Sequence, residues 1–260
     1  MTDAQRQRFD SLIEQGSFYE AEQMCTALYH RLQRSGKKQE AFDLLLYGAR
    51  QLAKGEQFQC AFVLLDKAQE YMKKQYFSEE SFSQVLNLLG TTFPNHLKPK
   101  VTLLNKLEKL ASEKHCSEDI VHKLHKFQAE TCIGMEDYRR ALSYYSFLND
   151  TQLYTSILEQ WMSEGLYSEE DLFVTRQILC LLAQGKRTMA KEVFKLCLQK
   201  HDNLNSSPLI GFIYLLLECL ERNLFSSLES LIAIYKSVFD RDANLWKLLH
   251  EAIDYSKKHR

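Results

Sequence analysis

The hydrophobic positions of the chain recur with helical periodicity along almost its whole length. One apolar stripe at three- and four-residue spacing runs through Ala21, Met24, Cys25, Leu28, Tyr29 and Leu32. Comparable stripes predict fourteen helices and no strand, over residues 3–15, 17–35, 37–54, 56–75, 78–92, 98–113, 117–133, 136–148, 151–164, 168–183, 187–201, 208–222, 226–239 and 241–257. Ser17 to Glu20 has the form of a capping box, and Ser78, Ser117, Thr151 and Ser168 are further predicted N-caps.

A short motif recurs where one predicted helix ends and the next begins. It is a glycine or acidic residue, then a position two residues later that is often aromatic, then an alanine five residues after the first. Copies occur at Gly16/Phe18/Ala21, Gly36/Lys38/Ala41, Glu56/Phe58/Ala61 and Glu136/Tyr138/Ala141, and a fainter one at Gly185/Ala190. We interpret the motif as scaffold, because a turn residue ends one helix and a small alanine lets the next pack closely.

The repeat is about 20 residues per helix, with short linkers, as stacked antiparallel hairpins require. The predicted fold is therefore all-α, an α-solenoid of about seven stacked hairpins in a tetratricopeptide-like right-handed superhelix. Its expected halves are residues 1–150 and 151–260.

Composition favours a soluble intracellular protein. The chain has 260 residues, a formal net charge of -1 and well-mixed charges, so it offers no broad basic field for nucleic acid. Seven scattered cysteines indicate reduced thiols, which suit the cytosol or the nucleus. The N-terminus has no apolar core typical of a signal peptide, and the longest apolar stretch, Leu209 to Leu217, is about half of a membrane span.

The sequence carries no recognisable catalytic motif. Phosphate-binding loops, dinucleotide-binding loops, zinc-protease helices and nucleophile elbows are all missing. His122 and His125, near His115 and Cys116, are the best metal candidates, but two polar residues on a solvated face explain them more simply. We therefore expect no enzymatic activity, no cofactor and no metal.

Two surfaces are predicted to bind partners. Arg31, Arg34, Lys37 and Lys38 surround the first hairpin turn, at a solenoid end that no preceding repeat covers, and could dock an acidic partner; a merely solvated turn is the alternative. The C-terminal half is more apolar than hairpin stacking needs. We expect an exposed groove there, with the hydrophobic core as the alternative position for its residues, which are Phe212, Leu216, Leu220, Leu224, Phe225, Trp246 and Leu249.

Several segments resemble one known family in order and spacing. They are Gly16–Met24, Tyr29–Ser35, Glu40–Ala41, Tyr47–Ala49, Glu170–Val174, Gln199–His201 and Pro208–Leu217. Together they are similar to the Golgi-to-ER traffic protein four family, a cytosolic subunit of the complex that prepares tail-anchored proteins for targeting.

The resemblance implies a non-enzymatic adaptor. Its N-terminal half is expected to dock on the pathway's dimeric targeting ATPase through Tyr19, Arg31 and Arg34, with Tyr19 as the anchor beside the arginines. The C-terminal half is expected to bind a ubiquitin-like-domain protein that recruits the upstream co-chaperone. The adaptor would thereby help to deliver tail-anchored proteins to the ER.

The sequence also departs from that family. An acidic residue that the family tends to carry in its fourth helix has no counterpart around Cys60, Ala61 and Phe62, which puts regulation of the ATPase through that position in doubt. The chain stops at Arg260 without the usual C-terminal extension, so fewer contacts to the ubiquitin-like partner are expected. Two other classes stay open. One is a helical-repeat scaffold of a proteasome-lid, signalosome or trafficking complex, which would end in a winged helix. The other is a helical enzyme with an unrecognised site.

Overall fold

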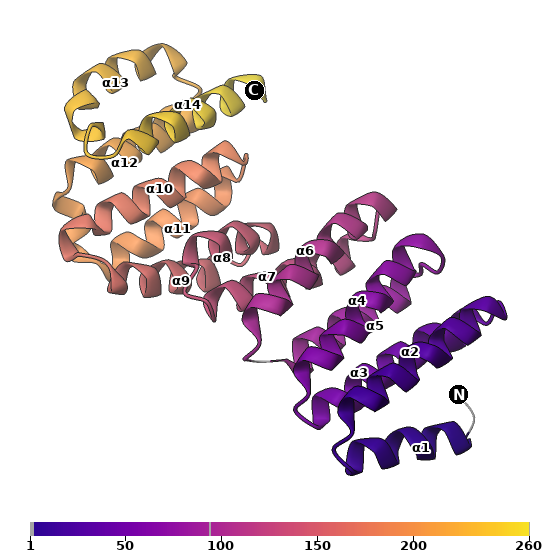
Figure 1. Cartoon of the computed structure of the whole chain (residues 1–260). Coiled ribbons are helices and arrows are strands. Elements are labelled where there is room, and N and C mark those ends of the chain that lie inside the picture. The colour runs from indigo at the N-terminus through magenta and orange to yellow at the C-terminus, as the bar shows by residue number, and fades with distance from the viewer. Residues whose placement is uncertain (1–2, 94, 260) are drawn as a thin grey trace. The chain divides into compact units, whose positions relative to one another are not determined.

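The computed structural model describes residues 3–93 and 95–259, and in them the chain forms fourteen α-helices and no strand (Figure 1). The helices are α1 Asp3–Glu14, α2 Phe18–Arg34, α3 Lys38–Lys54, α4 Phe58–Lys74, α5 Glu79–Thr92, α6 Leu97–Lys114, α7 Glu118–Ile133, α8 Tyr138–Tyr145, α9 Thr151–Glu164, α10 Glu170–Ala183, α11 Arg187–Lys200, α12 Pro208–Glu221, α13 Phe225–Phe239 and α14 Ala243–Lys258. Short 3-10 helices occupy Ser146–Leu148, Tyr167–Glu169 and Asp202–Ser206.

The predicted all-α solenoid is confirmed. Each of the fourteen helices predicted from periodicity is present, with ends within about two residues of the expected ones except at α8, whose last turn tightens into the 3-10 helix Ser146–Leu148. Where a winged-helix end would place strands, the described residues after 240 form α14.

The recurring motif has two structural roles, and the first is to end a helix. Its first residue takes the left-handed backbone conformation in all five copies, with φ of 74° at Gly16, 73° at Gly36, 59° at Glu56, 60° at Glu136 and 77° at Gly185. This residue ends a helix in a Schellman turn: the N–H of Gly16 donates to the carbonyl of Ile13 (3.1 Å) and that of Ser17 to the carbonyl of Leu12 (2.9 Å). The other four copies have the same pair of bonds.

The alanine of the motif is fully buried where the new helix packs on its neighbours. Its exposed fraction is 0% in every copy, at Ala21, Ala41, Ala61, Ala141 and Ala190. A methyl group at that position lets the new helix approach its neighbours without a gap or a clash. The motif is therefore a helix stop followed by a packing contact, as its pattern predicts.

Several predicted N-caps are wrong. Ser17 makes no side-chain cap bond, because it closes the preceding Schellman turn and its ψ of 56° lies outside the extended conformation that directs a capping oxygen at the helix. Ser78 does form a capping box, with Ser81 as its partner. Asp150 caps α9, with its carboxylate accepting from the N–H of Leu153 at 2.9 Å. The caps predicted at Ser117, Thr151 and Ser168 are not formed.

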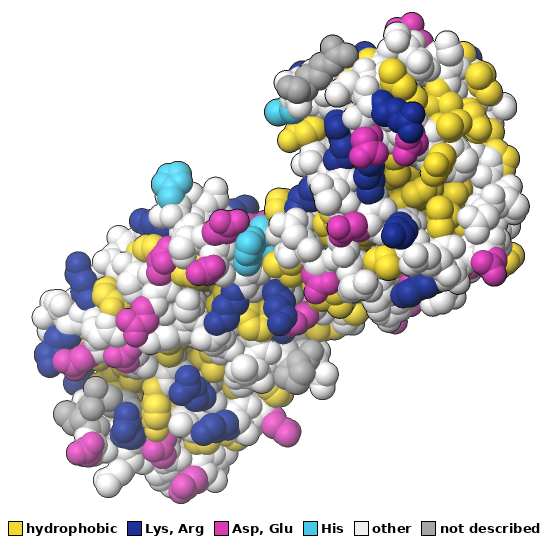
Figure 2. All heavy atoms as spheres, turned by 180° about the vertical axis from the view of Figure 1, so that it is seen from behind, with side chains coloured by type: hydrophobic (Ala, Val, Ile, Leu, Met, Phe, Trp, Pro, Cys, Tyr) yellow, Lys and Arg dark blue, Asp and Glu magenta, His cyan; other side chains and the backbone are white. Residues whose placement is uncertain are grey.

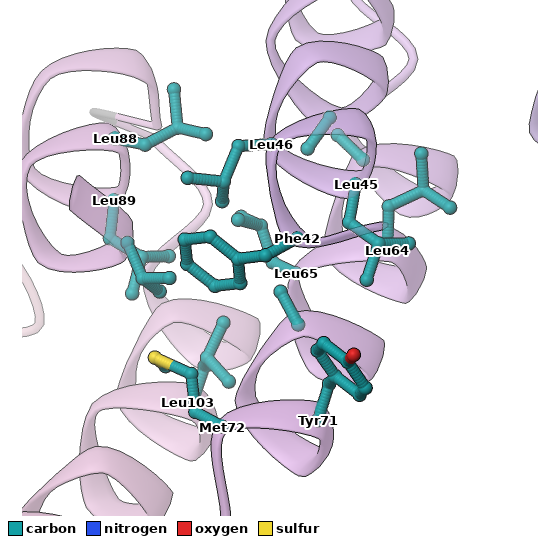
Figure 3. Packing of buried hydrophobic residues seen from close by; sticks show 14 of the residues in the cluster. Phe42, Leu45, Leu46, Leu64, Leu65, Tyr71, Met72, Leu88, Leu89 and Leu103 are labelled. Carbon is teal, nitrogen blue, oxygen red and sulfur yellow. The ribbon is translucent and has the colours of Figure 1, made fainter. Parts of the chain in front are cut away.

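The chain folds as two compact units, Met1–Asp137 and Tyr138–Arg260. The sequence pattern places the division at residue 150, whereas α8 and the 3-10 helix after it belong to the second unit. In the N-terminal unit, α2, α4 and α6 form one row, and α1, α3, α5 and α7 form the other. Figure 3 shows the core between the rows, where the ring of Phe42 lies among Leu46, Leu65 and Leu89.

The C-terminal unit closes differently, because α14 returns to pack along α10. Two salt bridges hold the connection between α13 and α14, residues 240–242. The guanidinium of Arg241 donates two hydrogen bonds to Asp171 (2.6 and 3.2 Å), and Nε of Arg176 donates to Oδ2 of Asp242 (2.6 Å). Asp242 also caps α14. Burial opposes ionisation of Asp242, but bonds from the Asn244 N–H and from Arg176 lower its pKa below the ordinary value.

We expect Ala21→Leu to reduce the free energy of unfolding by about 1–3 kcal/mol, because the added side chain overpacks a fully closed contact. Ala27→Leu is the matched control, since Ala27 lies on the exposed side of the same helix. Urea denaturation of both variants checks this. Equal stability of the two variants would contradict the role given to the motif alanine.

We expect Asp242→Asn to destabilise the chain by about 1–3 kcal/mol at pH 7. Because the folded-state pKa of Asp242 is depressed, its contribution is complete above the unfolded pKa of about 3.9 and is lost as pH falls through the folded value. The stability difference between wild type and variant should therefore shrink in acid. Thermal unfolding from pH 7 to pH 3 measures it, and a difference independent of pH would refute the contribution of the carboxylate charge.

Candidate docking surfaces

A cluster of accessible positive charge surrounds the turn between α2 and α3. Arg31 and Arg34 lie in the last turn of α2, where cations complement the carbonyl end of the helix, and Lys37 and Lys38 follow the turn. All four side chains are exposed. Lys37 pairs with Glu40 at 2.9 Å, whereas Arg31, Arg34 and Lys38 make no side-chain hydrogen bond or ion pair with any described residue. Three cations at one turn are thus available to a partner.

Tyr19 lies far from this turn. It is in the first turn of α2 and is 69% exposed, while its neighbour Phe18 packs against the core. The spacing of 12 and 15 residues to Arg31 and Arg34 separates them by about 18–22 Å along the helix. The prediction of Tyr19 beside the arginines is therefore wrong. Because 15 residues turn an α-helix to within about 60° of the starting direction, Tyr19 and Arg34 lie at the two ends of one face of α2.

A polar cleft of about 360 Å³ continues this face between α2 and α4. Its wall on α2 includes His30 and Gln33, and its wall on α4 includes Lys67, Glu70 and Lys74. Nζ of Lys74 lies 3.3 Å from the carboxylate of Glu70. The charges of this pair are therefore compensated within the chain.

The fourth helix, α4, has no acidic residue around Cys60, and a carboxylate from α2 lies near that position. Cys60 is half-buried on α4, and the carboxylate near it belongs to Glu22 of α2. Burial, then the charge of Glu22, raise the pKa of Cys60. Glu22 is itself buried and lies 3.6 Å from Nζ of Lys67, which donates to the hydroxyl of Thr26 at 2.8 Å. This carboxylate is a packed part of the α2–α4 contact and does not replace a surface acid.

The residues expected to line an apolar groove in the C-terminal unit are mostly core. The exposed fraction is 0% at Phe212, Leu216, Leu220 and Leu249. Phe212 packs edge-on against Phe239, with ring centroids 4.6 Å apart. Trp246 is half-buried and donates from Nε1 to Asp240 at 3.3 Å. The expectation of an exposed groove is therefore wrong for Phe212, Leu216, Leu220 and Leu249, and the alternative position in the core holds, because the packed helices α10, α12, α13 and α14 cover them. Leu224 remains 45% exposed, and Phe225 is half-buried.

Other apolar side chains of this unit are exposed instead. They are Tyr214 (56%) and Leu215 (39%) on α12, and Ile234 (74%) on α13, two helices that pack on each other. Figure 2 shows hydrophobic side chains gathered on a face of the C-terminal unit. The signal for them is the run Leu209–Leu217, which is apolar on all sides of its helix, so its outward face must expose apolar groups unless another element covers it.

His122 and His125, the candidate metal ligands, have different surroundings. His125 is buried, and His122 lies 3.6 Å from Glu118 on its own helix. Within residues 3–93 and 95–259, no three His, Cys, Asp or Glu side chains are placed to hold a metal. Burial raises the pKa of both Cys25 and Cys197 to about 12, so these thiols carry no thiolate at neutral pH. In the same described residues, no helix has the length and apolar character needed to cross a bilayer.

An all-α solenoid with exposed basic and apolar clusters belongs to the class of helical-repeat proteins. Within that class, the chain belongs to the Golgi to ER traffic protein 4 family, whose sequence model matches residues 35–254. That match does not extend over Tyr19, Arg31 and Arg34, which precede it.

Similar proteins from several species belong to the same family. The chain is 26% identical over 244 residues to the Golgi to ER traffic protein 4 homolog of Dictyostelium discoideum, covering 93% of this chain and 79% of that protein. It is 28% identical over 246 residues to the Homo sapiens homolog, covering 88% and 72%. The crystal structure of C. therm. Get4 has the same fold, with a TM-score of 0.75 at 15% sequence identity over 94% of this chain and 86% of that one.

Proposed function

We propose that the protein is a non-enzymatic cytosolic adaptor in the delivery of tail-anchored proteins to the ER. It bridges the targeting ATPase of that pathway, on its N-terminal unit, to a ubiquitin-like-domain protein or its large co-chaperone counterpart, on its C-terminal unit. Membership of the Golgi to ER traffic protein 4 family supports a role in Golgi-to-ER traffic. The two units, each with its own exposed cluster, suit a protein that binds two partners.

The observation that carries the proposal is the unpaired charge of Arg31, Arg34 and Lys38 at one turn. Exposed cations with no internal partner raise the local positive potential, which steers an acidic surface toward them and speeds association. Tyr19 adds an exposed ring at the other end of α2. Tyrosine is enriched in interfaces because its ring can be buried while its hydroxyl keeps a polar partner. We therefore assign the whole outer face of α2 to the ATPase.

The C-terminal unit offers a different chemistry. Tyr214, Leu215 and Ile234 are large apolar groups left in water, and their burial by a partner is favourable. We assign this surface of α12 and α13 to the ubiquitin-like partner, in place of the buried residues Phe212, Leu216, Leu220 and Leu249.

Arg31→Glu with Arg34→Glu should slow association with the targeting ATPase by about tenfold or more at low salt, because it reverses the steering charge. Added salt should slow the wild type in the same way. Stopped-flow or surface-based kinetics over a range of salt concentrations measure both effects. Lys195→Glu with Lys236→Glu is the matched control, since both lysines are exposed in the other unit and the net charge changes equally. Equal rates for the two double variants would exclude the basic turn as a docking site.

Tyr214→Ser with Ile234→Ser should weaken binding of the ubiquitin-like partner by about tenfold or more, because both lose apolar area that a partner buries. Leu166→Ser with Tyr167→Ser removes similar side chains, 65% and 71% exposed, elsewhere in the unit and should leave binding unchanged. Isothermal titration calorimetry compares the pairs. If the Tyr214→Ser with Ile234→Ser variant binds with wild-type affinity, α12 and α13 are not part of the interface.

A further inference from the structure

An open apolar cleft of about 550 Å³ lies between α4 and α6 in the N-terminal unit. Phe62 and Val63 line it from α4, and Pro99, Thr102 and Leu103 line it from α6. None of these residues belongs to the basic turn or to the surface assigned above. The cleft is therefore a separate feature of the row formed by α2, α4 and α6.

The cleft exists because short side chains face each other across two neighbouring helices. Val63, Pro99 and Thr102 are too small to fill the space between α4 and α6, so the packing that closes the core stops below them. Val63 remains 41% exposed. Phe62 is held in place, since its ring centroid lies 4.5 Å from that of buried Phe93. The apolar floor is thus preformed.

The charges at the rim are already compensated. Lys106 pairs with Asp66, and Lys67 bonds to Thr26 and lies 3.6 Å from Glu22. Glu70 pairs with Lys74 at 3.3 Å. The rim therefore offers an ionic ligand no uncompensated charge, whereas Phe62, Val63, Pro99 and Leu103 offer apolar surface, so the lining favours an apolar occupant.

The basic turn by itself cannot hold a partner firmly. Exposed ion pairs contribute about 0–1 kcal/mol each, and a stable interface buries about 800 Å² per partner around an apolar centre. The α4–α6 cleft supplies such a centre. It is continuous with the α2 face, because Lys67 and Glu70 line both this cleft and the polar cleft between α2 and α4.

We propose that the α4–α6 cleft is the apolar half of the ATPase docking surface and receives an amphipathic helix of that partner. The helix presents large apolar side chains at i, i+4 and i+7, the pattern by which an amphipathic helix lays its apolar face into a hydrophobic groove. Its acidic residues lie toward Arg31 and Arg34. This inference rests on the proposed function, because it assumes that the partner at the basic turn is the targeting ATPase.

The test compares dissociation of the purified ATPase from four forms of the full chain. Val63→Asp places a charge on the apolar floor, and Thr102→Trp fills the cleft from an exposed position of α6. Both should raise the off-rate about tenfold or more while leaving the salt dependence of association unchanged. Leu153→Asp, at a position 37% exposed in the other unit, is the control and should behave as the wild type. Circular dichroism verifies that each variant is folded. If Val63→Asp does not fold, Thr102→Trp alone tests the cleft.

The outcomes separate the two claims. If Arg31→Glu with Arg34→Glu slows association but Val63→Asp and Thr102→Trp dissociate at the wild-type rate, the cleft is not part of the surface and the proposed function stands. If the wild type shows no salt-sensitive binding to the ATPase, both claims fail. A higher off-rate in the two cleft variants with an unchanged control supports the inference.

Discussion

At five connections of this chain, one helix has to stop and the next has to begin in a new direction within three or four residues. The left-handed residue at positions such as Gly16 and Glu56 makes the stop, and the buried alanine five residues later makes the contact. The spacing between the helices is then very small. At Gly48 of α3, an added Cβ would lie 2.8 Å from both Sγ of Cys25 on α2 and Cδ1 of Leu64 on α4. Three helices meet at this point, and any side chain larger than hydrogen would require Cys25 and Leu64 to move.

This constraint also determines where binding surfaces can occur. Because the inner face of each helix is closed by its neighbours, accessible chemistry is confined to helix ends and to the outer side of a row. The cations of α2 lie at its end, beside a turn, and the α4–α6 cleft lies on the outer side of the row, where Val63, Pro99 and Thr102 leave space. Tyr19 and Arg34 occupy opposite ends of one helix, so a partner that contacts both must lie along α2.

The C-terminal unit departs from simple hairpin stacking. Its last helix, α14, packs along α10, and two arginine–aspartate contacts fix the connection before it. This return buries Leu249, and with α12 and α13 it makes a core out of residues that look surplus in a hairpin array. In both pairs the carboxylate is largely buried and the arginine is partly exposed. Such a pair specifies one position for the segment, because a buried carboxylate left without its cation is costly.

The sequence by itself determined the helical class, the number of helices, their ends and the role of the motif, because these depend on local periodicity and on the backbone preference of single residues. It also identified the basic turn, since charge beside a helix stop stays at the surface. The cap predicted at Ser17 is wrong, because the Schellman turn before it takes the serine out of capping geometry. Tertiary structure alone decided which apolar residues are accessible. Phe212 and Tyr214 stand two positions apart in one apolar run, yet their exposed fractions are 0% and 56%. The difference arises because other helices cover one side of α12 and leave the other in water, and no local pattern records which side that is.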